Sequence, residues 1–187
     1  MGSFSPDVAK SYNLSGVMLR STGIKFDVRL ASNDTYANYF YVNFSSYTGV
    51  NGDSYDRYLI RINEMVESLH IVNQVTAGML IGVTLGKICK QGISPYKSME
   101  SLINHFKYWS SGFPIKPGKV YSSVESPKGE FGVVLWSDGT GTPYRCKIRS
   151  PAYFSMQFLP KMVKGHFLAD LVTLIGTIDI VFGEIDR

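Results

Sequence analysis

The sequence is short of cysteine, of charged residues and of long hydrophobic runs, and each shortage excludes a class of protein. Two cysteines, Cys89 and Cys146, cannot build a disulfide scaffold or a cysteine-ligated metal site in a chain of 187 residues. No run of about 20 uncharged apolar residues occurs, so no transmembrane helix is expected. The 3 histidines lack the spacing of metal ligands, and no metal site is predicted.

The charged fraction of 18% lies below the roughly 25% of an average soluble domain, whereas the hydrophobic fraction is 44%. This composition excludes a disordered chain and indicates that partners, rather than water, cover much of the surface. The first residues also lack the pattern of a secretory signal or a transit peptide. We therefore expect a chain that is made where it works, or one that begins inside a longer structure.

Hydrophobic periodicity predicts two helices in the first two thirds of the chain. Apolar side chains recur at helical spacing over about residues 55–77. A second helix is expected to be capped by Ser94 or Ser98 and to end at Gly112. Before the first helix, the run Tyr36–Tyr47 alternates loosely and is interpreted as an extended segment.

Three strands are predicted next, over residues 119–125, 130–136 and 143–149. Pro160 is expected to open a final helix that Gly176 ends. Because that helix is apolar on most sides, we expect it to be buried. The predicted fold class is therefore α+β, mostly α-helical, with a small antiparallel β-sheet.

Basic residues concentrate around the predicted strands. Residues 116–164 carry eight lysines and arginines against three acidic residues, a net charge of +5, and in the third strand basic residues alternate with apolar or small ones. A solvated sheet face is the plain interpretation, and an acidic protein partner or nucleic acid also fits. No RNA- or DNA-binding signature occurs, so we favour a protein interface.

Two carboxylates, Asp170 and Asp179, interrupt the last apolar helix and the segment that follows it. A carboxylate in apolar surroundings is costly unless it is paired or hydrogen-bonded. One interpretation is a structural ion pair with one of the nearby basic residues, and the other is a polar group that lines an internal cavity. The residues alone leave both alternatives open.

Several short segments occur in an order that resembles one known family. They are Ser15–Arg20, Tyr55–Tyr58, Ser98–Leu102, Glu125–Glu130, Ser137–Gly139, Pro143–Arg149 and Gly176–Arg187. Over nearly the whole chain they resemble the C-terminal half of the forty-nine-kilodalton subunit of respiratory complex I, also called its D subunit or NADH dehydrogenase subunit 7. The resemblance implies that residues 1–187 are the C-terminal part of a single hydrogenase-large-subunit-like domain, whose N-terminal part is absent from this chain.

That family is related to the large subunit of nickel–iron hydrogenases, in which a C-terminal Asp-Pro-Cys-x-x-Cys-x-x-His motif supplies metal ligands. The resemblance aligns Asp179 with the Asp, Val181 with the first Cys, Glu184 with the second Cys and Arg187 with the His. Because valine cannot ligate a metal and nickel prefers thiolates, the resemblance implies that the metal site is lost. What remains is a cavity wall, with Asp179, Val181 and Phe182, that suits a flat apolar quinone headgroup.

The resemblance further implies a core peripheral-arm subunit of a proton-pumping NADH:ubiquinone oxidoreductase, without catalytic residues of its own. Ubiquinone is the implied substrate, a neighbouring subunit holds a 4Fe–4S cluster, and NAD and FMN bind elsewhere in the complex. Arg187 and Asp170 would brace the fold near the cluster-bearing subunit. A His and a Tyr that hydrogen-bond the quinone lie in the family's N-terminal half.

The implied partners are the N-terminal half of the subunit, if it is encoded separately, the cluster-bearing subunit, and other peripheral-arm and membrane-arm subunits, but no nucleic acid. The implied location is peripheral, on the matrix side of the mitochondrial inner membrane or the cytoplasmic side of a bacterial inner membrane. Two alternatives stay open: a purely structural docking fragment of the same assembly without quinone contact, and a basic RNA-binding module.

Overall fold

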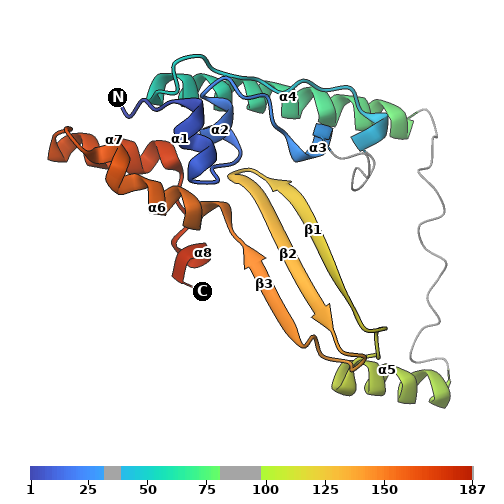
Figure 1. Ribbon diagram of the computed structural model, residues 1–187. Coiled ribbons are helices and arrows are strands. Elements are labelled where there is room, and N and C mark those ends of the chain that lie inside the picture. Colours follow the sequence, from blue (N-terminus) through green and yellow to red (C-terminus); the bar gives the residue numbers. More distant parts are fainter. Residues whose placement is uncertain (32–38, 81–97, 187) are drawn as a thin grey trace. The chain divides into compact units, whose positions relative to one another are not determined.

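The computed structural model describes residues 1–31, 39–80 and 98–186, which form helices and one small sheet (Figure 1). The fold class predicted from the sequence, α+β and mostly helical, is confirmed. The elements are, in chain order, α1 (Pro6–Ser11), α2 (Val17–Arg20), α3 (Val28–Ala31), the 3-10 helix η1 (Tyr39–Tyr41), α4 (Ser54–Leu80), α5 (Met99–Ser111), β1 (Gly118–Ser126), β2 (Gly129–Ser137), β3 (Arg145–Arg149), α6 (Pro151–Val163), α7 (Leu168–Ile178) and α8 (Phe182–Asp186).

The chain divides into two compact units. The first unit comprises Met1–Val75, Ser123–Gly132 and Arg149–Arg187, and the second comprises Thr76–Ser122 and Val133–Ile148. The expected site residues that the structure describes fall in the first unit. No helix in the described parts of the chain is long and apolar enough to cross a membrane.

The two long amphipathic helices of the sequence analysis are confirmed. The first is α4, and the second is α5, whose N-terminus is capped by Ser98: its hydroxyl oxygen accepts a hydrogen bond from the backbone N–H of Ser101 at 3.1 Å. The other candidate cap, Ser94, lies outside the described residues. Gly112 ends α5 with a φ of 69°, a backbone conformation that favours glycine.

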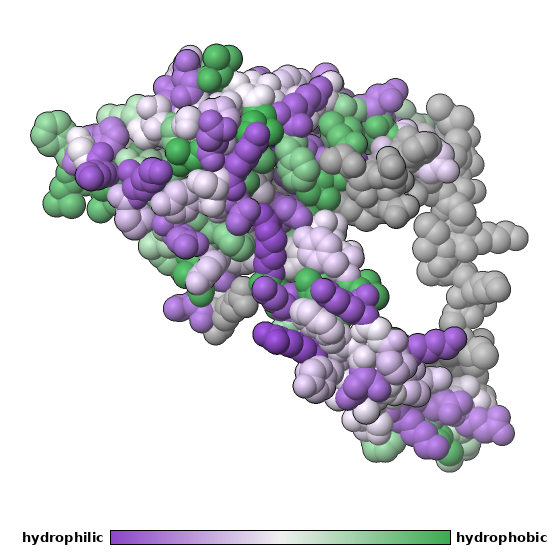
Figure 2. Space-filling model, viewed as in Figure 1, coloured by the Kyte–Doolittle hydropathy of each residue, from purple (hydrophilic) through white to green (hydrophobic). Residues whose placement is uncertain are grey.

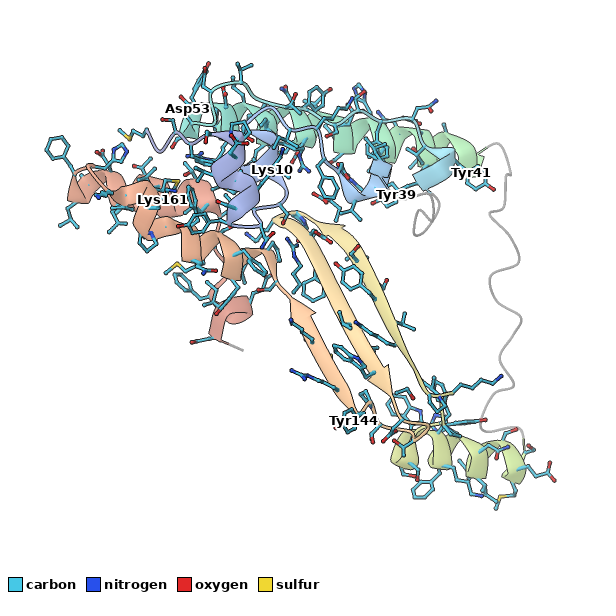
Figure 3. All side chains as sticks on the ribbon, viewed as in Figure 1. Lys10, Tyr39, Tyr41, Asp53, Tyr144 and Lys161 are labelled. Carbon is cyan, nitrogen blue, oxygen red and sulfur yellow. The ribbon has the colours of Figure 1, made fainter. Side chains whose placement is uncertain are left out.

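The three strands form an antiparallel sheet in the order β1-β2-β3, as predicted, with side chains on both of its faces (Figure 3). The β1–β2 turn lies against the start of α2. A Cβ on Gly16 would approach the Cα of Gly129 to 2.5 Å, so the close contact requires glycine. The Ser15 hydroxyl accepts a hydrogen bond from the backbone N–H of Glu130 at 3.1 Å and fixes the same contact.

The apolar core of the first unit is built where α6 and α7 pack against each other and against α1 and α2. Phe158, 1% exposed, lies at its centre, with the rings of Phe4 and Tyr12 edge-on at 4.8 and 5.2 Å. Such aromatic pairs add to the burial energy. The buried members of this core are Ala9, Leu14, Met18, Leu19, Phe158, Leu159, Met162, Leu174 and Ile178.

The expectation of a single final helix opened by Pro160 is wrong. Pro160 lies inside α6, near its C-terminal end. Its neighbours Phe158, Leu159 and Met162 are all buried in the core. Their packing outweighs the loss of one backbone hydrogen bond that a proline causes in a helix.

The expected end of this helix at Gly176 is also wrong. Gly176 continues α7, and the left-handed conformation that ends the helix is taken by Asp179, with φ 58° and ψ 59°. The prediction that this helix is buried on most sides is also wrong. In α7, Leu174 and Ile178 are buried, whereas Leu168 and Val172 are 82% and 73% exposed. Figure 2 shows hydrophobic side chains on the surface over this end of the chain.

The extended segment expected at Tyr36–Tyr47 is not a strand in its described part. Residues 36–38 lie outside the described residues, Tyr39–Tyr41 form η1, and residues 42–47 have no regular structure. The reason is that α4 side chains, rather than a neighbouring strand, satisfy this backbone. Gln74 exchanges two hydrogen bonds with the backbone of Asn43, at 2.9 and 2.6 Å.

Candidate functional site

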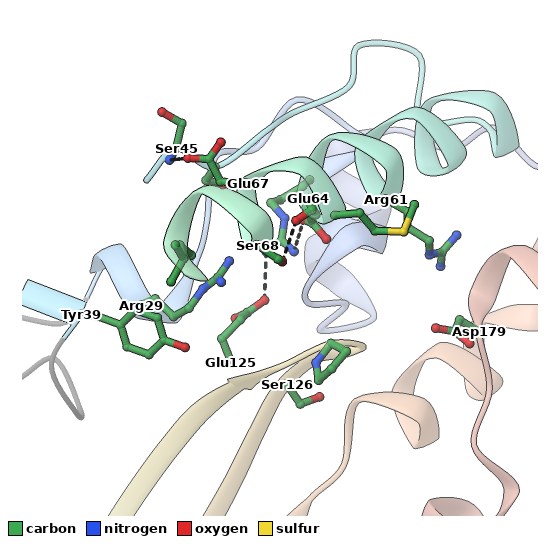
Figure 4. Close-up of a pocket in the computed structure, with 15 residues that line it drawn as sticks. Arg29, Tyr39, Ser45, Arg61, Glu64, Glu67, Ser68, Glu125, Ser126 and Asp179 are labelled. Carbon is green, nitrogen blue, oxygen red and sulfur yellow. Dashed lines mark hydrogen bonds and ion pairs between the residues drawn. The ribbon is translucent and has the colours of Figure 1, made fainter. Parts of the chain in front are cut away.

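A cavity of about 520 Å³ in the first unit lies among α2, α4 and the β1–β2 turn (Figure 4). Its wall carries charges of both signs together with a few apolar groups. The lining residues are Arg20, Arg29, Tyr39, Ser45, Ser46, Arg61, Glu64, Met65, Glu67, Ser68, Ile71, Glu125, Ser126, Pro127 and Asp179.

Arg20 joins several of the charged groups at the cavity. The residue is 2% exposed, and its guanidinium donates to Oε1 of Glu125 at 2.9 Å, to Oε1 of Glu64 at 2.7 Å and to the carbonyl of Phe26 at 3.2 Å. Oδ2 of Asp27 lies 3.9 Å from the same guanidinium. One buried cation therefore joins α2, the segment before α3, α4 and the end of β1.

Asp27 is shared between two arginines. Arg29 binds it with two parallel bonds, from Nε at 3.0 Å and from Nη2 at 2.7 Å. This bidentate geometry is the strong form of an arginine–carboxylate pair. The Arg29 guanidinium also lies 4.8 Å from the ring centre of Phe44, within the range of a cation–π contact.

The buried charges shift each other's ionisation. Burial lowers the pKa of Arg20, but the carboxylates of Glu64 and Glu125 outweigh it, and the pKa of Arg20 is raised. Burial raises the pKa of Glu125, and Arg20 offsets this only in part. Burial also acts to raise the pKa of Asp27, but the hydrogen bonds and charge of Arg29 outweigh it, and that pKa is lowered. Glu125 is thus the carboxyl of this cluster that takes up a proton more readily.

Asp179 is placed at the cavity by its backbone and by an ion pair. Its backbone N–H donates to the carbonyl of Ile175 at 3.3 Å and caps α7 in the left-handed conformation. Its carboxylate lies 2.6 Å from Nζ of Lys128, and Arg61 donates to the neighbouring carbonyl of Thr177 at 2.6 Å. Asp179 is thus ion-paired and is one of the residues that line this cavity, whereas its place in a quinone cavity stays a prediction.

The left-handed backbone of Asp179 is uncommon for a residue with a side chain. Among the described non-glycine residues only Asn13 and Asp179 have a positive φ. Aspartate tolerates this region better than most residues, for which the conformation costs about 1–2 kcal/mol. An outlier of this kind marks a position that the surrounding structure holds in place, and such positions cluster at functional sites.

The remaining expected residues take different places. Val181, half-buried, lies in the link between α7 and α8, and Phe182 begins α8 with 66% of its surface exposed. Neither lines the 520 Å³ cavity. Arg187 lies outside the described residues. The quinone-wall role of Val181 and Phe182 stays a prediction.

Asp170 has a local structural contact. Its Oδ2 accepts a hydrogen bond from the backbone N–H of Phe167 at 3.1 Å and lies 3.8 Å from Nδ1 of His166. The carboxylate thus satisfies an otherwise free N–H at the start of α7. A role of Asp170 near a cluster-bearing partner stays a prediction.

The short helix α8 is attached to the rest of the first unit at Glu184. The hydroxyl of Ser150, the residue that precedes α6, donates to the carbonyl of Glu184 at 3.3 Å. Oε2 of Glu184 is buried and has no hydrogen-bond partner in the described structure. An orphaned buried carboxylate oxygen of this kind calls for a partner group beyond the described residues.

The basic strand face is partly engaged within the chain. The side chains of Lys119 and Arg145 lie 5.2 and 5.8 Å from the ring centre of Trp136, and Arg149 pairs with Glu130 at 3.0 Å. Lys147 is exposed. The preference for a protein interface on this face stays a prediction.

Sequence reasoning missed the two buried arginines. Arg20 follows an apolar run, and Arg57 lies in an amphipathic helix, so neither has a local signal of burial. Arg57 is 0% exposed and donates to the carbonyls of Gly52 at 2.9 Å and Gly2 at 3.2 Å. Burial and the nearby charge of Arg61 lower the pKa of Arg57 to about 10.

No group of three or more His, Cys, Asp or Glu side chains in the described part of the chain could hold a metal ion.

Residues 1–187 match the family described as respiratory-chain NADH dehydrogenase, 49 Kd subunit. The chain is 57% identical to the NADH-ubiquinone oxidoreductase 49 kDa subunit of Paramecium tetraurelia. It is 49% identical both to the 49 kDa subunit of Acanthamoeba castellanii and to the corresponding NADH-quinone oxidoreductase polypeptide of Orientia tsutsugamushi (strain Boryong).

These matches show that the chain is part of a subunit of a respiratory NADH dehydrogenase. The chain belongs to the 49 kDa subunit family of that enzyme. Each alignment covers 100% of this chain but only 50%, 47% and 48% of the three relatives. The chain thus spans about half the length of the curated relatives it matches.

Proposed function

We propose that this chain works as part of a proton-translocating NADH:ubiquinone oxidoreductase and forms one wall of the cavity in which ubiquinone is reduced. The names of its relatives, NADH-ubiquinone and NADH-quinone oxidoreductase, support the assignment. The observation that carries it is Asp179: a strained left-handed cap, held by Lys128, that lines a cavity and leads directly into Val181 and Phe182.

The chemistry assigned to this chain is binding and positioning, not electron transfer. Reduction of a quinone to a quinol takes two electrons and two protons. A 4Fe–4S cluster in a neighbouring subunit supplies the electrons, and NAD and FMN bind elsewhere in the complex. Half-buried Val181 and exposed Phe182 offer apolar contact to a flat ring. A quinone site of this kind is mostly apolar, with a few placed polar groups.

The polar groups have supporting roles in this proposal. Asp179 supplies one placed carboxylate, and Lys128 fixes its direction through the 2.6 Å ion pair. Asp170 stabilises the N-terminus of α7, the helix that carries Asp179 at its other end. Arg187 and Asp170 are assigned to the side of the cluster-bearing subunit. The complex holds the chain peripherally, on the matrix side of the mitochondrial inner membrane.

The test is Val181→Met in the intact complex. Methionine keeps the site apolar but is longer and more flexible. A change of this size in an apolar pocket alters binding about tenfold or more, so we expect sensitivity to a quinone-site inhibitor to change by that factor. Val172→Met, at a 73% exposed valine of α7, is the matched control and leaves inhibition unchanged. Unaltered inhibition and turnover in Val181→Met would contradict the placement.

A second candidate is a structural docking fragment of the same complex. It is favoured by the exposed apolar side chains of α5, since Met99, Phe106 and Trp109 are 72%, 70% and 80% exposed. Exposed clusters of this kind mark interaction surfaces. This candidate predicts that Val181→Met assembles and responds to the inhibitor as the wild type does, whereas Trp109→Ala lowers the amount of assembled complex.

A further inference from the structure

Two buried polar atoms at the 520 Å³ cavity have no hydrogen-bond partner in the described part of the chain. They are Nε of Arg20 and Oγ of Ser46, and both residues line the cavity. Arg20 is 2% exposed, and its two Nη atoms already donate to other groups. A buried donor without an acceptor is costly, so these two atoms indicate a ligand that exchanges hydrogen bonds with both.

The charges of the cavity wall favour a neutral ligand. Three arginines and four carboxylates line the cavity, so the wall is close to electrically balanced. A free ion of either sign would therefore meet repulsion as well as attraction. Buried polar cavities bind ordered water once they exceed roughly 10–15 Å³, the space that one water molecule needs. A cavity of about 520 Å³ has room for many.

Acidic and basic side chains alternate along this wall (Figure 4). Glu125 accepts a hydrogen bond from Arg20 at 2.9 Å, and Arg20 donates to Glu64 at 2.7 Å. Arg61, on the same helix as Glu64, interacts electrostatically with both Glu64 and Asp179. Three carboxyl groups, from β1, α4 and the C-terminus of α7, are thus separated by arginines. Because arginine does not release its proton, a proton passes between these carboxyl groups only through bridging molecules.

Glu125 is the carboxyl of this series that holds a proton most readily. Its side chain is 4% exposed, and burial raises its pKa, which the charge of Arg20 offsets only in part. The other charged groups that face it are Asp27, which precedes α3, and Arg29 of α3. A buried carboxyl whose pKa is moved toward neutral pH is suited to take up and release a proton.

We propose that the cavity holds a chain of ordered water molecules, bound by Arg20 Nε and Ser46 Oγ, that carries protons from Glu125 to Asp179 for the reduction of quinone. Each transfer breaks one O–H bond and forms another. Glu125 gives its proton to water, water gives a proton to Asp179, and Asp179, two residues before Val181, gives one to an oxygen of the reduced quinone. Glu125 then regains a proton from solvent. The proposal rests on the proposed function, for which it names the source of the protons.

The water chain is tested by a structure of the intact complex at a resolution that shows ordered water. We expect water molecules within about 2.7–3.2 Å of Arg20 Nε and of Ser46 Oγ, the range of a hydrogen bond. The proposal is overturned if the cavity holds no ordered water, or if a side chain of another polypeptide fills it and binds both atoms.

The proton transfer is tested by Glu125→Gln in the intact complex. We expect kcat for quinone reduction to fall at least about tenfold, since a placed proton donor contributes that much or more. The decline of the rate at alkaline pH should disappear, because glutamine has no proton to lose, whereas KM for quinone stays unchanged. Glu130→Gln is the matched control: it makes the same change on the same hairpin, at an acid paired with Arg149 at 3.0 Å and outside the cavity, and keeps the wild-type kcat and pH profile.

Glu125→Asp separates proton transfer from a structural role. The variant keeps a carboxyl whose ordinary pKa is about 0.4 units lower, so we expect a higher kcat than in Glu125→Gln and an alkaline decline that begins at lower pH. Electron transfer from NADH to a soluble artificial acceptor measures assembly without quinone. If Glu125→Gln lowers this activity equally, the loss is one of assembly, and an alkaline decline that does not move in Glu125→Asp overturns the proposal.

Failure of the water chain and failure of the proposed function give different results. An unchanged kcat and pH profile in Glu125→Gln, together with altered inhibition in Val181→Met, overturns the proton route and leaves the quinone wall in place. Unaltered inhibition in Val181→Met, together with a lost alkaline decline in Glu125→Gln, contradicts the placement of Val181 and supports the proton route.

Discussion

The first unit is held together in two different ways, and the difference shows where the structure is sensitive. Around Phe158 many apolar contacts are made by α1, α2, α6 and α7, and each is individually small. Around Arg20 a few charged groups depend on one cation, because removing it takes the ion-pair partner from Glu64 and from the buried Glu125. The apolar core is stabilised by many small contacts. The residues around the cavity are instead held by a few ion pairs that share one arginine.

The largest loss of stability is expected for Arg20→Met. Methionine removes the cation that pairs with the buried Glu125, and breaking a buried pair costs about 3–5 kcal/mol. We expect a loss of that size in the free energy of unfolding, measured by urea denaturation of the chain. Lys10→Met removes a charge at an exposed site and should cost less than about 0.5 kcal/mol. Equal effects of the two variants would show that the cluster is not cooperative.

The apolar core is tested by Leu174→Ala. Leu174 is 0% exposed, and truncating a buried leucine costs about 2–5 kcal/mol, with the low end where the site can collapse. Because many neighbours share the loss, we expect about 3 kcal/mol, less than for Arg20. Val172→Ala on the same helix, at a 73% exposed position, is the control. A loss for Leu174→Ala as small as that of the control would place Leu174 outside the core.

The two buried acids of the cluster predict opposite responses to pH. The lowered pKa of Asp27 stabilises the fold at neutral pH, and this contribution is lost as the pH falls through the folded pKa. The raised pKa of Glu125 favours the fold at low pH, and this contribution is lost as the pH rises through the folded pKa.

Glu125→Gln should therefore flatten the decline in stability above the ordinary carboxyl range, and Asp27→Asn should flatten the decline below it. We expect each change to appear as a shallower dependence of stability on pH in the variant than in the wild type. Urea midpoints measured across pH for the wild type and both variants check this. Parallel profiles for all three would mean that neither carboxyl titrates differently on folding.

The smallest expected effect on stability is that of Lys128→Met. The side chains of the Lys128–Asp179 pair are 24% and 47% exposed, and pairs of this kind contribute about 0–1 kcal/mol. We expect the urea midpoint to change little while sensitivity to a quinone-site inhibitor shifts, because Asp179 loses its orientation. Lys164→Met, at an exposed lysine, is the control. A large destabilisation with unchanged inhibition would make the pair purely structural.

Local features of the fold were predictable from the sequence. Periodicity predicted α4 over about residues 55–77, close to its bounds Ser54–Leu80, and Ser98 was one of two predicted caps for α5. Short alternating runs between turns predicted the strands. The helix start predicted at Pro160 and the helix end predicted at Gly176 were wrong, because packing in the core outweighs the tendency of proline and glycine to interrupt a helix. Such packing involves residues distant in sequence, which a local pattern does not show.

The site was predictable only in part. The family resemblance pointed to Asp179, whose role in a quinone cavity stays a prediction, and its ion pair was one of two interpretations. The Arg20 cluster was missed because its partners Glu64 and Glu125 lie 44 and 105 positions away in the sequence. A buried charge network assembled over such separations has no local signal in the sequence.

The central claim, that the segment after α7 lines a quinone cavity, is tested most directly by a structure of the intact complex with a quinone-site inhibitor bound. The account predicts that a side chain of residues 177–186, with Val181 or Phe182 first, lies within about 4.5 Å of the inhibitor, the limit of apolar contact. If other polypeptide separates the inhibitor from all of these side chains, the chain is a structural part of the complex and the quinone assignment is wrong.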